Sequence, residues 1–86
     1  MAIVYYPDGT HKDVLPKNGK SFTLDELQEC VGGWVEHIPV RVADCIVLAD
    51  EDGLMKRLPV NPTASTMAGR VLVGPIMFLT DKEMGS

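Results

Sequence analysis

The sequence predicts an α+β fold in one small domain, with an antiparallel or mixed sheet of about five strands, one main helix and one short helix. Three observations support this prediction. Residues 1–86 are enough for a single domain, and 45% hydrophobic with 23% charged residues is ordinary globular composition. Short apolar and β-branched runs alternate with Pro/Gly turn signals. Two segments carry signals that begin and end a helix.

The main helix is expected over Thr23–Val31, where local signals agree. Thr23 is a good N-cap and Glu26 completes a capping box, while Phe22 and Leu27 can form a hydrophobic staple. Two glycines follow and offer the positive backbone angle that ends a helix. The apolar face of this helix is expected to consist of Leu24, Leu27 and Val31.

Apolar or alternating runs predict the strands. The segments expected to be extended are Ala2–Tyr6, His11–Leu15, Trp34–Val40, Cys45–Ala49, Leu54–Val60 and Arg70–Leu79. The first two form a hairpin, and the continuous apolar run Cys45–Ala49 predicts a central strand. Leu54–Val60 is expected to pair back along it after an Asp-Gly turn, and Pro39 limits its own strand to an edge, an end or a bulge. A bend is expected at Gly74-Pro75, and Thr80–Ser86 is expected to be a frayed tail.

Composition and charge exclude several classes of function. The formal charge is −4 with a pI near 4.9, and the longest basic run is Lys56–Arg57, so we expect no nucleic-acid partner. No apolar run approaches the length of a membrane span, and no signal peptide is evident before the first strand. Cys30 and Cys45 are interpreted as free thiols of a cytoplasmic protein, with a disulfide as the alternative.

No pattern predicts catalysis. His11 and His37 lack companions at metal-ligand spacing, and no nucleophile or phosphate-loop motif is present. We therefore expect no enzyme, no metal and no cofactor.

Two segments carry groups that suit the binding of a small ligand. Asn61-Pro62 begins a short helix, Thr63–Ala68, whose N–H groups together with the hydroxyls of Thr63 and Ser65 suit an anion. The alternative is a capped helix with a purely structural role.

Strand alternation also places the carboxylate of Glu36 beside the Trp34 ring, where the two can bind a ribose or a base. The alternative is a Glu36 ion pair with Arg41 or Arg70. The candidate ligand-binding residues are Trp34, Glu36, Asn61, Thr63, Ser65 and Arg70.

The order of several segments resembles the domain of unknown function 3846 family. The matching segments are Leu27–Glu36 (LQECVGGWVE), Asp50–Gly53 (DEDG), Leu58–Ala64 (LPVNPTA) and Gly69–Gly74 (GRVLVG). The resemblance covers about residues 22–79 and leaves the amino-terminal hairpin unmatched. It implies a small phage or mobile-element protein in the cytoplasm of a bacterial host cell, and it implies no activity.

Two functions are consistent with these observations. The first is a non-catalytic protein that binds and sequesters a small anionic, nucleotide-like ligand such as a host immune signal. The alternative is a protein–protein inhibitor of a host defence or regulatory complex. A homodimer is expected, because a chain of this size gains core from a shared interface and Arg70–Leu79 would need covering at a sheet edge.

Overall fold

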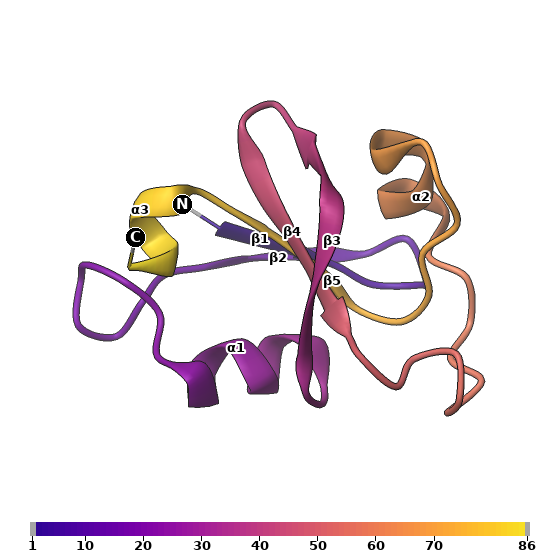
Figure 1. The fold of residues 1–86 in the computed structure, drawn as a ribbon, viewed down its shortest axis with the longest axis horizontal. Coiled ribbons are helices and arrows are strands. Elements are labelled where there is room, and N and C mark those ends of the chain that lie inside the picture. The colour runs from indigo at the N-terminus through magenta and orange to yellow at the C-terminus, as the bar shows by residue number, and fades with distance from the viewer. Residues whose placement is uncertain (1, 86) are drawn as a thin grey trace.

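The computed structural model describes residues 2–85, and its centre is a five-stranded antiparallel sheet with the strand order β2-β1-β5-β4-β3. The strands are β1 (Ala2–Tyr5), β2 (His11–Val14), β3 (Val35–Val42), β4 (Cys45–Asp50) and β5 (Ile76–Leu79). The helices are α1 (Leu24–Val31), α2 (Pro62–Ala68) and α3 (Asp81–Met84). In Figure 1, α1 lies below the sheet and α2 above it. The predicted α+β class and the five-stranded sheet are confirmed.

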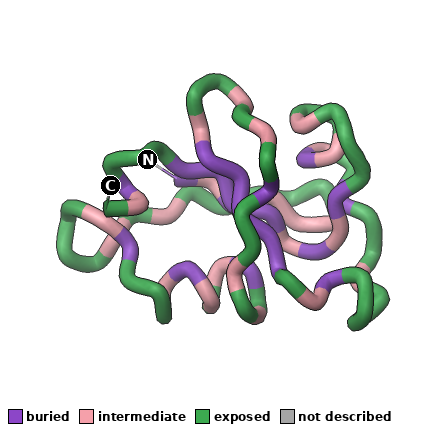
Figure 2. The backbone as a smooth tube through the Cα atoms, in the orientation of Figure 1, coloured by how far each residue is buried: buried purple, intermediate pink, exposed green. Residues whose placement is uncertain are grey.

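The sheet is covered on both faces, so the core has two parts. Alternate residues of β4 divide between them, since successive strand side chains point to opposite faces. Ile46 and Leu48 pack with Leu27 and Val31 on the α1 side, whereas Val47 packs on the α2 side. Figure 2 shows the buried residues concentrated along the central strands. The predicted central position of Cys45–Ala49 is therefore confirmed.

The signals for the main helix are confirmed in detail. The Thr23 hydroxyl accepts a hydrogen bond from the Glu26 N–H, the Glu26 carboxylate accepts one from the Thr23 N–H, and Gly32 ends the helix at φ 84°. One part of the prediction is wrong: Leu24 is 58% exposed. It is the first residue of the helix and is not part of the core that contains Leu27 and Val31.

β3 is an edge strand with a register shift between Ile38 and Arg41, as expected around Pro39. It begins at Val35 rather than at Trp34 and continues to Val42. The turn to β4 consists of two residues, Ala43 and Asp44, both with positive φ. Such turns match the natural twist of the flanking strands. The segment that the sequence indicated only as a connection is therefore a tight hairpin.

Two predicted strands are wrong in part or in whole. Leu54–Val60 does not pair along β4, because β3 and β5 occupy both edges of that strand. Residues 54–57 form turns, Leu58 and Pro59 have no regular structure, and Val60 makes one bridge to Val73. The last strand is only Ile76–Leu79. The expected bend lies just before it, at Gly74 with φ 72°, and separates it from residues 70–73, which are not part of the strand. β5 is also central, which removes the expected exposed edge.

The expected frayed tail is a short helix over most of its length. Thr80 and Glu83 form a second capping box around α3, and Glu83 is only 8% exposed. The Phe22 N–H donates to the Glu83 carbonyl at 2.7 Å, which fixes the start of α1 against α3. Ser86 lies outside the described residues. Between residues 2 and 85, no helix has the length and hydrophobicity to cross a membrane.

Candidate functional site

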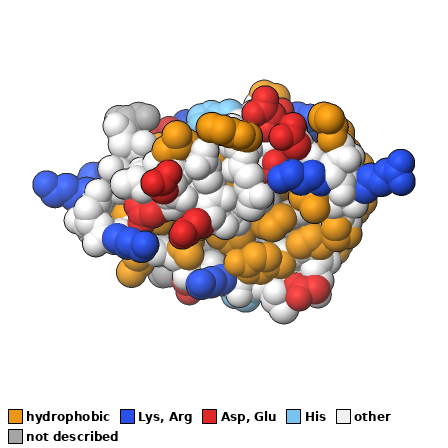
Figure 3. All heavy atoms as spheres, turned by 90° about the horizontal axis from the view of Figure 1, so that it is seen from below, with side chains coloured by type: hydrophobic (Ala, Val, Ile, Leu, Met, Phe, Trp, Pro, Cys, Tyr) orange, Lys and Arg blue, Asp and Glu red, His pale blue; other side chains and the backbone are white. Residues whose placement is uncertain are grey.

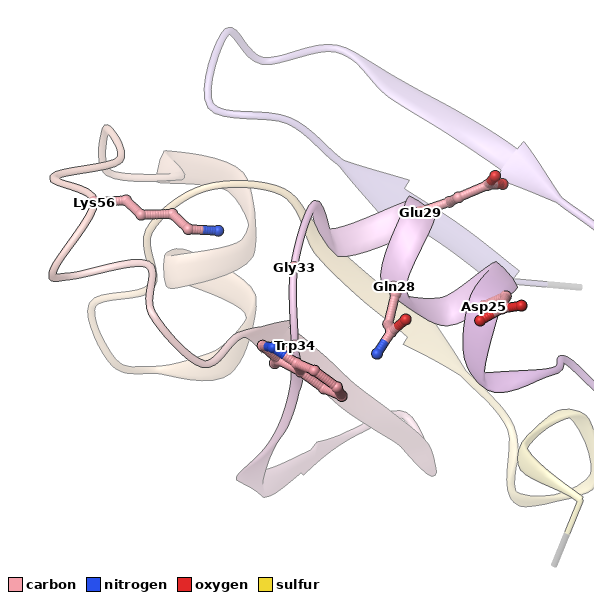
Figure 4. A pocket seen from close by; sticks show the side chains of 6 residues that line it. All are labelled: Asp25, Gln28, Glu29, Gly33, Trp34 and Lys56. Carbon is pink, nitrogen blue, oxygen red and sulfur yellow. The ribbon is translucent and has the colours of Figure 1, made fainter.

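An open groove of about 620 Å³ lies where α1 ends and β3 begins. The residues that line it are Asp25, Gln28, Glu29, Gly33, Trp34 and Lys56. In Figure 4 the Gln28 amide and the Trp34 ring point toward one another, Lys56 lies on one side of them, and Asp25 and Glu29 lie on the other. The Trp34 side chain is 64% exposed and is the single tryptophan of the chain. The groove thus combines an aromatic face, an amide, an ammonium and two carboxylates.

An ion pair places Lys56 at this groove. Its Nζ donates to Oδ2 of Asp50 at 2.7 Å and lies 3.4 Å from the Gly32 carbonyl oxygen. The Asp50 side chain is buried, at 1% exposure, whereas that of Lys56 is 44% exposed. A lysine ammonium has three N–H donors, so these two acceptors leave one for the groove.

Asp50 stays charged despite its burial. Burial alone would raise the pKa of this carboxyl, but the hydrogen bond from Lys56 and the one from the Asp52 N–H favour the charged form. The net result is a pKa below the ordinary value. The carboxylate therefore remains a fixed partner for Lys56 at neutral pH.

Gly33 allows this arrangement through its missing side chain. A Cβ here would lie 2.8 Å from Oδ1 of Asp50 and 2.8 Å from Nζ of Lys56. Its φ is not positive, so the requirement is steric and does not arise from backbone strain. The Gly-Gly pair thus has two separate roles: Gly32 ends α1, and Gly33 makes room for the ion pair.

The structure separates Trp34 from Glu36, which sequence alternation placed on one face. Trp34 precedes β3 and lines the groove beside α1, whereas Glu36 pairs across the sheet with Ala49, which packs on the α2 side. Glu36 and Arg70 instead line a second, smaller hollow of about 150 Å³. Arg41 pairs with Asp81 at 2.6 Å, so its ion pair is not with Glu36.

Three ligand-binding residues were predicted at the start of α2, and two of them have a structural role instead. Asn61 is fully buried, and its Nδ2 donates to the carbonyl oxygens of Tyr5 and Gly74, at 2.9 Å each. Its Oδ1 accepts the Ala64 N–H at 3.1 Å.

The Ser65 hydroxyl is likewise bonded to both backbone groups of Leu72. Thr63 is half-buried in the first turn. Of the six candidate residues, Trp34 alone lines the larger groove, and we do not include Asn61 or Ser65 in a ligand site.

Sequence reasoning missed the other groove residues. Asp25 and Gln28 are three residues apart on α1, and that spacing places them on one side of a helix. It could have indicated a polar stripe leading to Trp34. Lys56 had no such signal, since it reaches the groove from a segment that was expected to be a strand.

The surface around the groove has mixed charge. Seen from the α1 side, Figure 3 shows acidic and basic side chains intermingled, with hydrophobic side chains exposed among them. Among residues 2–85, no three His, Cys, Asp or Glu side chains gather closely enough to hold a metal ion. Cys30 and Cys45 are free thiols, and they pack against the cores on opposite sides of the sheet.

Fold and groove together define a small α+β domain with a two-sided core and an open polar groove beside its main helix. A family model described as "Domain of unknown function (DUF3846)" matches residues 2–86, and the chain belongs to this family. The match includes the amino-terminal hairpin, which the sequence motifs had left outside. No curated protein and no solved structure matched the chain in the other two comparisons.

Proposed function

We propose that the protein is a small non-catalytic binding protein of phage type, which binds and sequesters a small anionic, nucleotide-like ligand in the bacterial cytoplasm. A host immune signal is the kind of molecule we have in mind. One observation carries the proposal: the exposed Trp34 ring faces an open groove between the Gln28 amide and the Lys56 ammonium.

Each of these three groups can contact a different part of a nucleotide-like ligand. Base stacking on an exposed aromatic ring contributes about 1–3 kcal/mol per base. A glutamine amide both donates and accepts hydrogen bonds, so Gln28 can pair with the edge of a base. The free N–H of Lys56 can donate to a phosphate oxygen, and Asp50 keeps the ammonium in place.

The experiment is to incubate the purified protein with lysates of cells that produce an immune signal and of cells that do not. The protein is re-purified and denatured by heat, and mass spectrometry identifies the released small molecules. We expect an intact nucleotide-like molecule from the protein and from Leu15→Ala, a control at an exposed side chain outside the groove.

Trp34→Ala and Gln28→Ala should release much less of that molecule. Failure of the folded protein to retain any such molecule from either lysate would refute the proposal. Release of a chemically altered molecule would instead indicate an enzyme.

A second candidate function is inhibition of a host defence or regulatory protein. It is supported by Leu54, Met55 and Val71, which are 80%, 84% and 72% exposed. Large apolar side chains exposed to this extent are common at protein–protein contacts. Leu54 and Val71 also line the hollow that contains Glu36 and Arg70, so an apolar contact there would have charged groups beside it.

The homodimer remains a proposal, although one of its two reasons, an exposed edge at the last strand, does not hold because β5 is central. The same exposed side chains now support it. Light scattering at micromolar concentrations should give twice the 9.4 kDa chain mass, and Leu54→Asp should reduce it to that of one chain. A 9.4 kDa particle at all concentrations would refute the dimer and leave this surface for a different protein.

A further inference from the structure

We infer that the groove selects a nucleotide with a single phosphate and an amino-bearing base, and this inference rests on the proposed function. The proposal follows from how charge is distributed along the groove. Lys56 is at one end and Asp25 is at the other, and Trp34 with Gln28 lies between them, while the Glu29 carboxylate points away from the Trp34 ring. A ligand that stacks on Trp34 and extends along the groove therefore meets a cation at one end and the Asp25 carboxylate at the other.

The end of the groove that contains Lys56 favours binding of one phosphate group and disfavours binding of a triphosphate. Lys56 is the single cation among the residues lining the groove, and Asp50 already neutralises much of its charge at 2.7 Å. A triphosphate would bring about four negative charges to a chain whose formal charge is −4, and only one ammonium N–H remains to receive them.

The acidic end suits a base with an amino group. A carboxylate only accepts hydrogen bonds, so Asp25 favours an N–H₂ group over a carbonyl oxygen. Adenine and cytosine present such a group on the Watson–Crick edge, and uracil presents carbonyl oxygens flanking one N–H. A carbonyl facing a carboxylate would leave both acceptors without a donor.

The test titrates the protein with adenosine 5′-monophosphate, uridine 5′-monophosphate and adenosine 5′-triphosphate. The indole N–H resonance of Trp34 reports binding, and it is unambiguous because the chain has one tryptophan. We expect the adenosine monophosphate to bind about tenfold more tightly than the uridine monophosphate, since one hydrogen-bonded pair distinguishes them. The triphosphate should bind more weakly than the adenosine monophosphate.

The matched variant is Asp25→Asn, which keeps size and removes charge at an exposed residue. In this variant both preferences should shrink, because an amide can also donate to a carbonyl oxygen and no longer repels phosphate. Equal affinity for the two monophosphates, or a triphosphate that binds as tightly as adenosine monophosphate, would overturn the inference and leave the proposed function standing. If no probe shifts the Trp34 resonance, the inference is overturned here, and the lysate experiment decides the proposed function separately.

Discussion

Replacing Gly33 by alanine should disrupt the buried ion pair without straining the backbone. The new Cβ would meet Oδ1 and Cγ of Asp50 at 2.8 and 2.9 Å and Nζ of Lys56 at 2.8 Å, so the pair has to separate or shift. Leaving a buried charge without its partner costs about 3–5 kcal/mol. Lys56 is half-exposed and water can follow it, so we expect a loss near the lower limit. The lower entropy of an unfolded alanine returns about 0.4–1 kcal/mol. The net expected loss is about 2 kcal/mol.

The assay is urea and thermal unfolding followed by circular dichroism, where about 2 kcal/mol corresponds to a fall in Tm of roughly 10 °C for a domain of this size. Gly32→Ala is the matched control: its φ is 84° and a Cβ there meets nothing within 4 Å, so it should lose only the cost of a left-handed alanine, about 1 kcal/mol. In an Asp50→Ala background, Gly33→Ala should cost little more, because the carboxylate it strikes is gone. A Gly33→Ala loss that is no larger than that of Gly32→Ala, or that is fully additive with Asp50→Ala, would refute the steric argument.

Three further predictions concern stability. Asn61→Ala should lower the free energy of unfolding by about 3 kcal/mol, since three buried hydrogen bonds are lost, whereas Thr63→Ala nearby should change it by less than about 0.5 kcal/mol; equal urea midpoints for the two variants would contradict this. The folded-state pKa of Asp50 lies below its unfolded value of about 3.9, so its contribution is present above that pH and is lost as the pH falls through the folded pKa. Urea midpoints should therefore drop from pH 6 to pH 3, and less so in Asp50→Asn; an identical drop in both proteins would exclude Asp50 as a cause. Thr80→Ala and Thr23→Ala should each cost about 1 kcal/mol through loss of a helix cap, and an unchanged melting temperature for Thr80→Ala would show that the Thr80 cap does not stabilise the fold.

Local chemistry made part of the fold predictable. The capping box at Thr23, the Asn61 cap and the buried run of β4 each depend on residues within a few positions, and all three were read correctly. Strand pairing depends on distant residues. Leu54–Val60 has a pattern compatible with a strand, but both edges of β4 are already paired, one with β3 and the other with β5. Nothing local to Leu54–Val60 reveals that competition.

In the candidate site, too, residues with a local sequence signal were predictable and residues placed by distant contacts were not. The sequence indicates Trp34 because its ring can stack on a base and because strand alternation places it beside Glu36. The structure places Trp34 in the larger groove but separates it from Glu36. Lys56 was not selected, since its position depends on Asp50 and on the path of a segment without regular structure. Asn61 was selected for binding because a cap and an anion use the same donors. In the structure Asn61 is buried and its own Oδ1 accepts the Ala64 N–H, so this donor is already bonded within the fold. No local pattern indicates that burial.

The strand order also governs when this chain can fold during its synthesis. β5 joins the β1–β2 hairpin to the β3–β4 hairpin, and the pairing of Ile3 with Phe78 connects nearly the two ends of the sequence. A nascent chain halted before Ile76 has two separate hairpins, and an isolated two-stranded hairpin is marginally stable at best in water. The amino-terminal residues therefore leave the ribosome long before their partner strand exists. The sheet can form only after β5 has been synthesised, and a chain that stops before Ile76 exposes strand edges that chaperones and proteases can bind.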